Sequence, residues 1–108
     1  MEIIERLRLR REGAVRRHFS RAAGDVEEIG RRLVGLRRAL DAHTRSLEQL
    51  LSGGADAMNV RLYRQCIDGI SQTIAEQQGR LVEARRRMQQ RREQLLATIG
   101  RREETAAK

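Results

Sequence analysis

The sequence contains no proline, no tryptophan and only two aromatic residues, Phe19 and Tyr63. The absence of proline removes the residue that most strongly interrupts helices. So few aromatic side chains in 108 residues leave little material for a globular core, which favours a thin apolar seam. The chain is instead rich in Arg, Glu, Gln, Leu and Ala, a composition typical of long helices. We therefore expect an all-α chain forming a single domain over residues 1–108.

Cysteine and long apolar runs are equally scarce. Cys66 is the only cysteine, so it cannot form an internal disulfide, and a reducing compartment is expected. Its neighbours Tyr63 and Ile67 suggest that it acts as a small buried hydrophobe rather than a reactive thiol. No apolar run approaches the roughly 18 residues that would span a bilayer. Residues 1–11 also lack the hydrophobic region of a signal peptide, which predicts a cytoplasmic protein with no membrane insertion.

Apolar residues recur with steps that alternate between three and four, the pattern of a coiled-coil seam. In the first half of the chain the seam residues are Val15, Phe19, Ala22, Val26, Ile29, Leu33, Leu36, Leu40, His43, Leu47 and Leu50. In the second half they are Val60, Tyr63, Ile67, Ile70, Ile74, Gln77, Leu81, Ala84, Met88, Arg91 and Leu95, and Ile99 continues the stripe. Before Val15 the steps become four and four, through Arg11 to Leu7 and then Ile4, which predicts a stutter.

A glycine-containing break separates the two runs. Adjacent Gly53 and Gly54 favour a turn, and Asp56 can cap the helix that follows. The pattern predicts a helix over about 2–51, a turn at 52–56 and a second helix over about 57–104, folded as an antiparallel coiled-coil hairpin. Facing residues would have numbers that sum to 110, with Ala55 at the midpoint and Leu47 opposite Tyr63.

The net charge of +8 is unevenly distributed: residues 1–38 carry +5, residues 39–78 carry −2 and residues 79–108 carry +5. Folding at the turn would bring both basic segments to one open end. The arginines concerned include Arg10, Arg11, Arg16, Arg17, Arg85, Arg86, Arg87, Arg91 and Arg92. Three interpretations remain open for this end: solvation alone, a phosphate-binding surface for nucleic acid, and a site for an acidic protein. The shortage of aromatic residues removes the stacking platform that single-stranded nucleic acid needs.

The sequence gives no support for catalysis. His18 and His43 stand 25 residues apart on one predicted helix, and no third residue is placed to complete a triad or a metal site. No glycine-rich phosphate loop is present, and a two-helix hairpin is too thin to enclose a substrate. We expect a binding protein with no enzymatic activity, metal, cofactor or small-molecule substrate.

Residues 63–78 carry a more specific signal, with the sequence YRQCIDGISQTIAEQQ. This stretch resembles the start of the second helix in the FliJ/YscO (SctO) family, the central stalk proteins of flagellar and virulence type III secretion systems. The resemblance extends more loosely over nearly the whole chain as a hairpin with a basic open end. Cys66 stands where family members often have a bulky aromatic residue, and the tip and C-terminus are short, which favours a virulence system over a flagellar one.

The resemblance implies a cytoplasmic stalk, peripheral to the secretion apparatus, that links two partners by protein binding. Its basic open end would enter the pore of a hexameric secretion ATPase and regulate it, and its other end would contact the cytoplasmic domain of the export gate. Secretion chaperones are a further class of implied partner. By similarity, gate contact maps to the tip-proximal residues Leu36, Leu40, His43, Leu47, Cys66, Ile70, Thr73 and Gln77. Several of these also lie in the predicted seam.

Two alternatives remain. The first is a generic coiled-coil scaffold or adaptor, whose seam docks onto another amphipathic helix. The second is a nonspecific nucleic-acid binder that recognises phosphates through its arginines without reading sequence.

Overall fold

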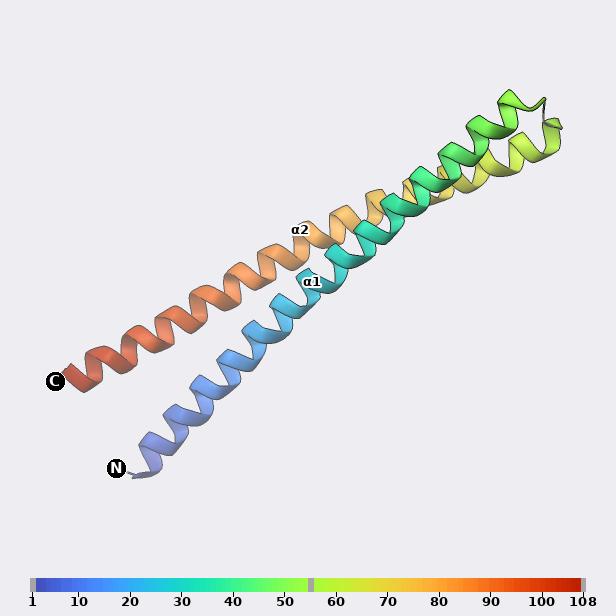
Figure 1. The fold of residues 1–108 in the computed structure, drawn as a ribbon. Coiled ribbons are helices and arrows are strands. Elements are labelled where there is room, and N and C mark those ends of the chain that lie inside the picture. The colour runs from blue at the N-terminus through green and yellow to red at the C-terminus, as the bar shows by residue number, and fades with distance from the viewer. Residues whose placement is uncertain (1, 55, 108) are drawn as a thin grey trace. The chain divides into compact units, whose positions relative to one another are not determined.

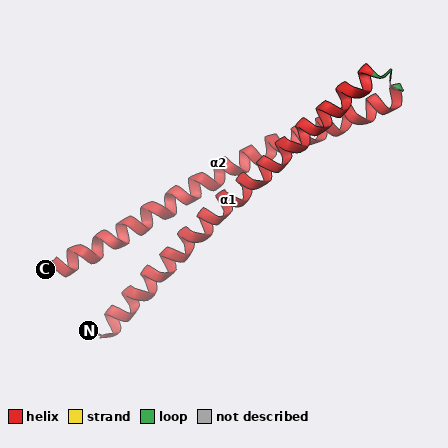
Figure 2. Cartoon of the chain, viewed as in Figure 1, coloured by secondary structure: helices red, strands yellow, loops and turns green. Residues whose placement is uncertain are grey.

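The computed structural model describes residues 2–54 and 56–107, with side chains at 102 and 104–107 left aside. Two helices account for nearly all of them: α1 over Glu2–Ser52 and α2 over Ala57–Ala107 (Figure 1). No strand occurs among the described residues (Figure 2). The predicted fold class, two long helices in an antiparallel hairpin, is confirmed. The helices end one residue and three residues later than the sequence-based bounds of 51 and 104.

The turn between the helices follows the chemistry expected from its sequence. At the end of α1 the Gly53 amide donates a hydrogen bond to the Gln49 carbonyl at 3.0 Å. Gly54 adopts φ +74°, a left-handed conformation that glycine enters without steric cost. Asp56 caps α2, because its Oδ1 accepts the Met58 amide at 3.1 Å. The predicted midpoint, Ala55, lies outside the described residues.

The chain divides into two compact units, each of which pairs a stretch of α1 with a stretch of α2. Unit 1 contains residues 1–27 and 82–108, and unit 2 contains residues 28–81 with the turn. In unit 2 the buried apolar side chains are Ile29, Leu33 and Ile74. In unit 1 they are only Ala22 and Ala84. Unit 1 therefore has the smaller apolar core among the described residues.

The predicted seam is confirmed over most of its length. Every seam residue from Val15 to Leu50 and from Val60 to Leu95 is buried or half-buried. A coiled coil needs this regularity, since steps of three and four keep one stripe facing the partner helix. The predicted pairing, in which the numbers of facing residues sum to 110, stays a prediction. One ring contact in unit 2, between His43 and Tyr63, differs from this pairing by about one helical turn.

The predicted stutter before Val15 is wrong. Arg11 is exposed, and Leu7 and Ile4 are 58% and 56% exposed, whereas Glu12 is buried at 7%. The step from Val15 to Glu12 is three, so the seam keeps its alternation instead of following the apolar residues. A stripe that continued through Leu7 and Ile4 would turn away from α2, because a break in the heptad repeat requires the coiled coil to unwind locally.

Neither α1 nor α2, within the residues described, contains a stretch long and apolar enough to cross a membrane.

Candidate partner-binding surfaces

The arginines predicted to form a basic end all lie in unit 1. Eight of the nine are exposed, and the exception, Arg91, is half-buried at a seam position. Arg91 Nη1 donates a hydrogen bond to Gln94 Oε1 at 3.0 Å, which fixes it along its own helix. Long arginine stems can lie along an apolar seam while the guanidinium stays near water. These arginines therefore share one unit, and Arg91 is only partly exposed there.

Two of these arginines are held by their own helix. Arg16 Nη2 lies 3.0 Å from Glu12 Oε1, a pair one turn apart in which the carboxylate side chain is nearly buried. Arg17 folds back over Gly13, since a Cβ added at Gly13 would lie 3.3 Å from Arg17 Nη1. The pair with Glu12 neutralises part of the positive charge at Arg16, whereas the Arg17 guanidinium only lies near the Gly13 backbone.

The other six of these arginines have no carboxylate partner among the side chains that the structure describes. Among the described side chains, no carboxylate forms a salt bridge with Arg10, Arg11, Arg85, Arg86, Arg87 or Arg92. Unit 1 contains 15 basic and 9 acidic residues, a net charge of +6, while unit 2 has 8 and 6, a net charge of +2. A surface of unpaired arginines attracts anionic groups and steers their approach.

The tip-proximal set lies in unit 2 but forms no continuous free surface. Leu36, Leu40, His43, Leu47, Ile70 and Thr73 are half-buried, Gln77 is buried, and only Cys66 is exposed. Most residues of this set therefore contribute to the seam, which limits what another protein can contact without opening the helix pair.

Cys66 departs from its sequence-based interpretation. It was predicted to be a buried hydrophobe, but it is a free and exposed thiol. The reason is its position one residue before the seam residue Ile67, because a rotation of about 100° turns it to the outer side of the helix.

Gln77 and Thr73 show how polar groups are accommodated near the seam. The Thr73 hydroxyl donates a hydrogen bond to the Gly69 carbonyl at 2.9 Å, so its polarity is satisfied within α2. Gln77 is 9% exposed, and its Oε1 atom is buried without a hydrogen-bond partner. A buried acceptor of this kind costs stability, since it has exchanged water for apolar surroundings.

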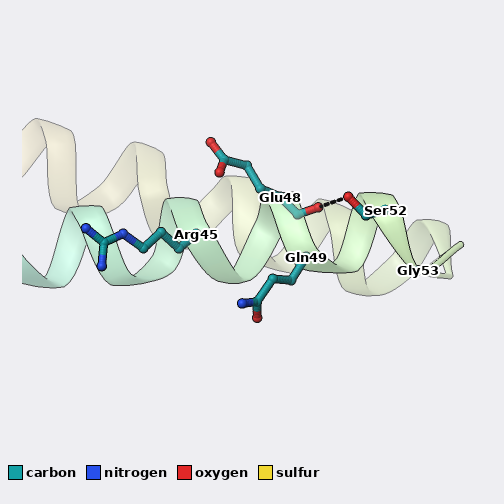
Figure 3. A pocket seen from close by; sticks show the side chains of 5 residues that line it. All are labelled: Arg45, Glu48, Gln49, Ser52 and Gly53. Atoms are coloured by element: carbon teal, nitrogen blue, oxygen red, sulfur yellow. Dashed lines mark hydrogen bonds between the residues drawn. The ribbon is translucent and has the colours of Figure 1, made fainter.

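A surface pocket lies at the end of α1, lined by Arg45, Glu48, Gln49, Ser52 and Gly53 (Figure 3). All five residues are exposed, so the pocket is a shallow groove rather than an enclosed cavity. The Ser52 hydroxyl is bonded to the Glu48 carbonyl at 3.0 Å and so completes the helix end. In the part of the chain that the structure describes, no three His, Cys, Asp or Glu residues gather as a metal site.

One functional feature escaped the sequence reasoning: Glu12, a buried carboxylate within the basic unit. The signal that could have found it is the uninterrupted alternation of steps, which reaches residue 12 if charge is ignored. A search for apolar residues overlooks an acidic residue at a seam position, and it therefore selects Leu7 and Ile4 instead.

Two helices that share a thin seam, with an exposed basic surface on unit 1, define an all-α helical-hairpin protein. The family model described as "Flagellar FliJ protein" matches residues 1–106. The chain belongs to this family, and the predicted FliJ/YscO resemblance is confirmed. Comparison with curated proteins gives no match, and neither does comparison with solved structures. Membership implies a structural stalk protein of flagellar or type III secretion that interacts with components of the secretion apparatus.

Proposed function

We propose that this chain is a cytoplasmic coupling stalk that binds the hexameric secretion ATPase through unit 1 and the export gate through unit 2. The observation that carries the proposal is the set of exposed arginines on unit 1 that have no carboxylate partner among the described residues. An ATPase pore lined with acidic groups would complement this surface, and Arg is the residue best suited to paired contacts with carboxylates.

The seam supports a mechanical role. Each helix is 51 residues long and lacks proline, a common cause of helix kinks. Coupling two partners requires stiffness and two binding surfaces, and it requires no catalytic group. Regulation of the ATPase would then arise from binding alone.

The decisive experiment measures ATP hydrolysis by the cognate hexameric ATPase with and without this chain. Arg85, Arg86 and Arg87 are changed together to Glu, which reverses three neighbouring charges on one exposed segment of unit 1. We expect both binding and stimulation of hydrolysis to fall by at least about tenfold, since charge reversal at an electrostatic interface creates repulsion.

A matched control reverses three exposed arginines of unit 2, namely Arg37, Arg61 and Arg64. This variant changes the net charge by the same amount and should stimulate the ATPase as the wild type does. If both triple variants stimulate equally, or if neither binds differently from wild type, the assignment of the ATPase surface is wrong. Recovery of the ATPase by pull-down from the native cell would separate the stalk from a generic coiled-coil scaffold.

Nucleic-acid binding is the weaker candidate, since only the arginines favour it. A nonspecific binder would lose affinity for DNA or RNA steeply as salt rises, without any preference for sequence.

A further inference from the structure

The two sides of the helix pair in unit 2 differ sharply in charge. With the seam residues as heptad positions a and d, positions c and g of both helices line one side of an antiparallel pair, and positions b and e line the other. Within residues 35–49 of α1 and 59–73 of α2, every residue at a c or g position is uncharged. The b and e positions of the same stretches hold Arg37, Asp41, Glu48, Arg61, Arg64 and Asp68. If the charged residues served only to keep the surface hydrated, both sides would carry them. Solvation alone therefore does not explain the difference between the two sides.

The uncharged side presents mostly small residues on both helices, with one large apolar residue, Leu62, on α2. We call it the uncharged face and define it by Ala39, Ala42 and Ser46 of α1 with Leu62, Cys66 and Gly69 of α2. Leu62 is 53% exposed, and Ala42, Cys66 and Gly69 are also exposed. A Cβ added at Gly69 would meet no atom within 4 Å, so the α2 backbone is bare at that point.

This combination suits a third helix. Small residues on both helices permit close approach of another helix, and the exposed Leu62 side chain offers apolar area to bury. The face extends over residues 35–49 of α1, which corresponds to about 21 Å at the helical rise, or two heptads of a partner.

The rim of the face indicates the charge of its occupant. Arg38 and Arg45 are exposed and stand seven residues apart, at the heptad position just outside the α1 wall. The corresponding positions of α2 are Gln65 and Gln72, which are neutral. A helix seated on the face would therefore meet positive charge on one flank only. A second copy of this chain fits poorly, because each copy has a net charge of +8.

We propose that the uncharged face of unit 2 docks an amphipathic helix of another protein, with an apolar stripe against Leu62 and Cys66 and acidic residues beside Arg38 and Arg45. Of the residues to which family resemblance assigns gate contact, the face as defined contains Cys66 alone, and docking here leaves the seam closed. The proposal holds whether or not unit 1 binds an ATPase.

The test uses the full chain and two synthetic helical peptides of about three heptads, both with Leu and Ala on one stripe. One peptide has Glu on a single flank of the stripe, and the other has Lys there. Binding is followed by fluorescence anisotropy of the labelled peptide. The Glu peptide should bind at least about tenfold more tightly than the Lys peptide, because only its flank complements Arg38 and Arg45.

Two exposed alanines provide a matched pair of variants. Ala42→Glu places a charge on the uncharged face, and Ala75→Glu places the same charge on the opposite side of the pair. We expect Ala42→Glu to reduce affinity for the Glu peptide by at least about tenfold and Ala75→Glu to leave it unchanged. Equal helix content of the two variants by circular dichroism excludes a folding defect.

Cys66 supplies a second readout on the unmodified protein. As the only cysteine, exposed at the centre of the face, it should react with a thiol reagent several-fold more slowly when the Glu peptide is bound. Equal binding of both peptides, equal effects of the two alanine variants, or an unprotected thiol at saturation would each overturn the proposal. Dimerisation of the chain by light scattering that Ala42→Glu abolishes would assign the face to a second copy instead.

Discussion

The rings of His43 and Tyr63 lie with their centroids 6.2 Å apart and their planes inclined at 56°, across the two helices of unit 2. His43 Nδ1 is 2.8 Å from the Ala39 carbonyl. A carbonyl can only accept, so Nδ1 carries the proton, and the ring is fixed against its own helix while its face meets Tyr63. Aromatic contacts of this geometry favour one register, because a slide of one helical turn would separate the rings.

We expect this contact to be measurable as a coupling energy. In a double-mutant cycle with His43→Ala and Tyr63→Ala, the coupling should be about 0.5–1.5 kcal/mol, the range found for paired rings. Chemical denaturation followed by circular dichroism gives the free energies of unfolding. The pair His18→Ala and Tyr63→Ala serves as the control, since His18 is exposed and lies in unit 1. A coupling near zero for the first pair would show that the two rings do not stabilise the register.

Gln77→Leu should stabilise the chain. Its buried Oε1 atom has no partner, and replacing a polar group in that state by an apolar one of similar size removes the desolvation cost, about 1 kcal/mol. The neighbouring Gln78 is exposed, so Gln78→Leu should leave stability nearly unchanged. Thermal denaturation of both variants provides the comparison. An equal or lower melting temperature for Gln77→Leu would mean that this acceptor is satisfied in solution.

The position of the seam in the N-terminal part of α1 can be tested by comparing leucine substitutions at two adjacent residues. Glu12→Leu places an apolar side chain at the buried position and should stabilise by about 1 kcal/mol, since it removes a carboxylate from the seam while the Arg16 side chain, 55% exposed, stays hydrated. Arg11→Leu places it at an exposed position and should have little effect. Melting temperatures of the two variants distinguish the two registers. The reverse order would restore the stutter that the sequence suggested.

Two glycines should respond to alanine in opposite directions. Gly24 is an exposed helical residue with open space around its Cβ position, so Gly24→Ala should stabilise by about 1 kcal/mol through helix propensity. Gly54 has φ +74°, where alanine is strained, so Gly54→Ala should destabilise by about 1 kcal/mol. Denaturant titration of both variants measures the two effects. A stabilising Gly54→Ala would contradict the left-handed turn.

Hydrogen exchange should divide the chain along α1. Residues 2–11 are exposed throughout, whereas unit 2 buries Ile29, Leu33 and Ile74. Amides of 2–11 should therefore exchange much faster than those around Leu33, because local opening there breaks few packing contacts. Mass spectrometry of peptic fragments measures both. Comparable protection of the two segments would indicate that the exposed apolar side chains Ile3 and Leu7 are covered in solution.

The fold class, the turn and the seam could be predicted from the residues alone. Three-and-four spacing of apolar residues is a property of the helix, so it survives in any context that pairs two helices. The glycines and Asp56 likewise act locally, through backbone conformation and capping, and Asp56 does accept the Met58 amide. The family was also recognisable from the resemblance of residues 63–78, and the family model matches residues 1–106.

Which residues at the margins of that pattern are buried became clear from the packing of the two helices. Glu12 is buried although it is charged, because it occupies a seam position, and Cys66 is exposed because it lies one residue outside the seam. The same holds for the uncharged face. Its residue types are readable in the sequence, but only the pairing of α1 with α2 brings Ala42 and Leu62 to one side of the molecule.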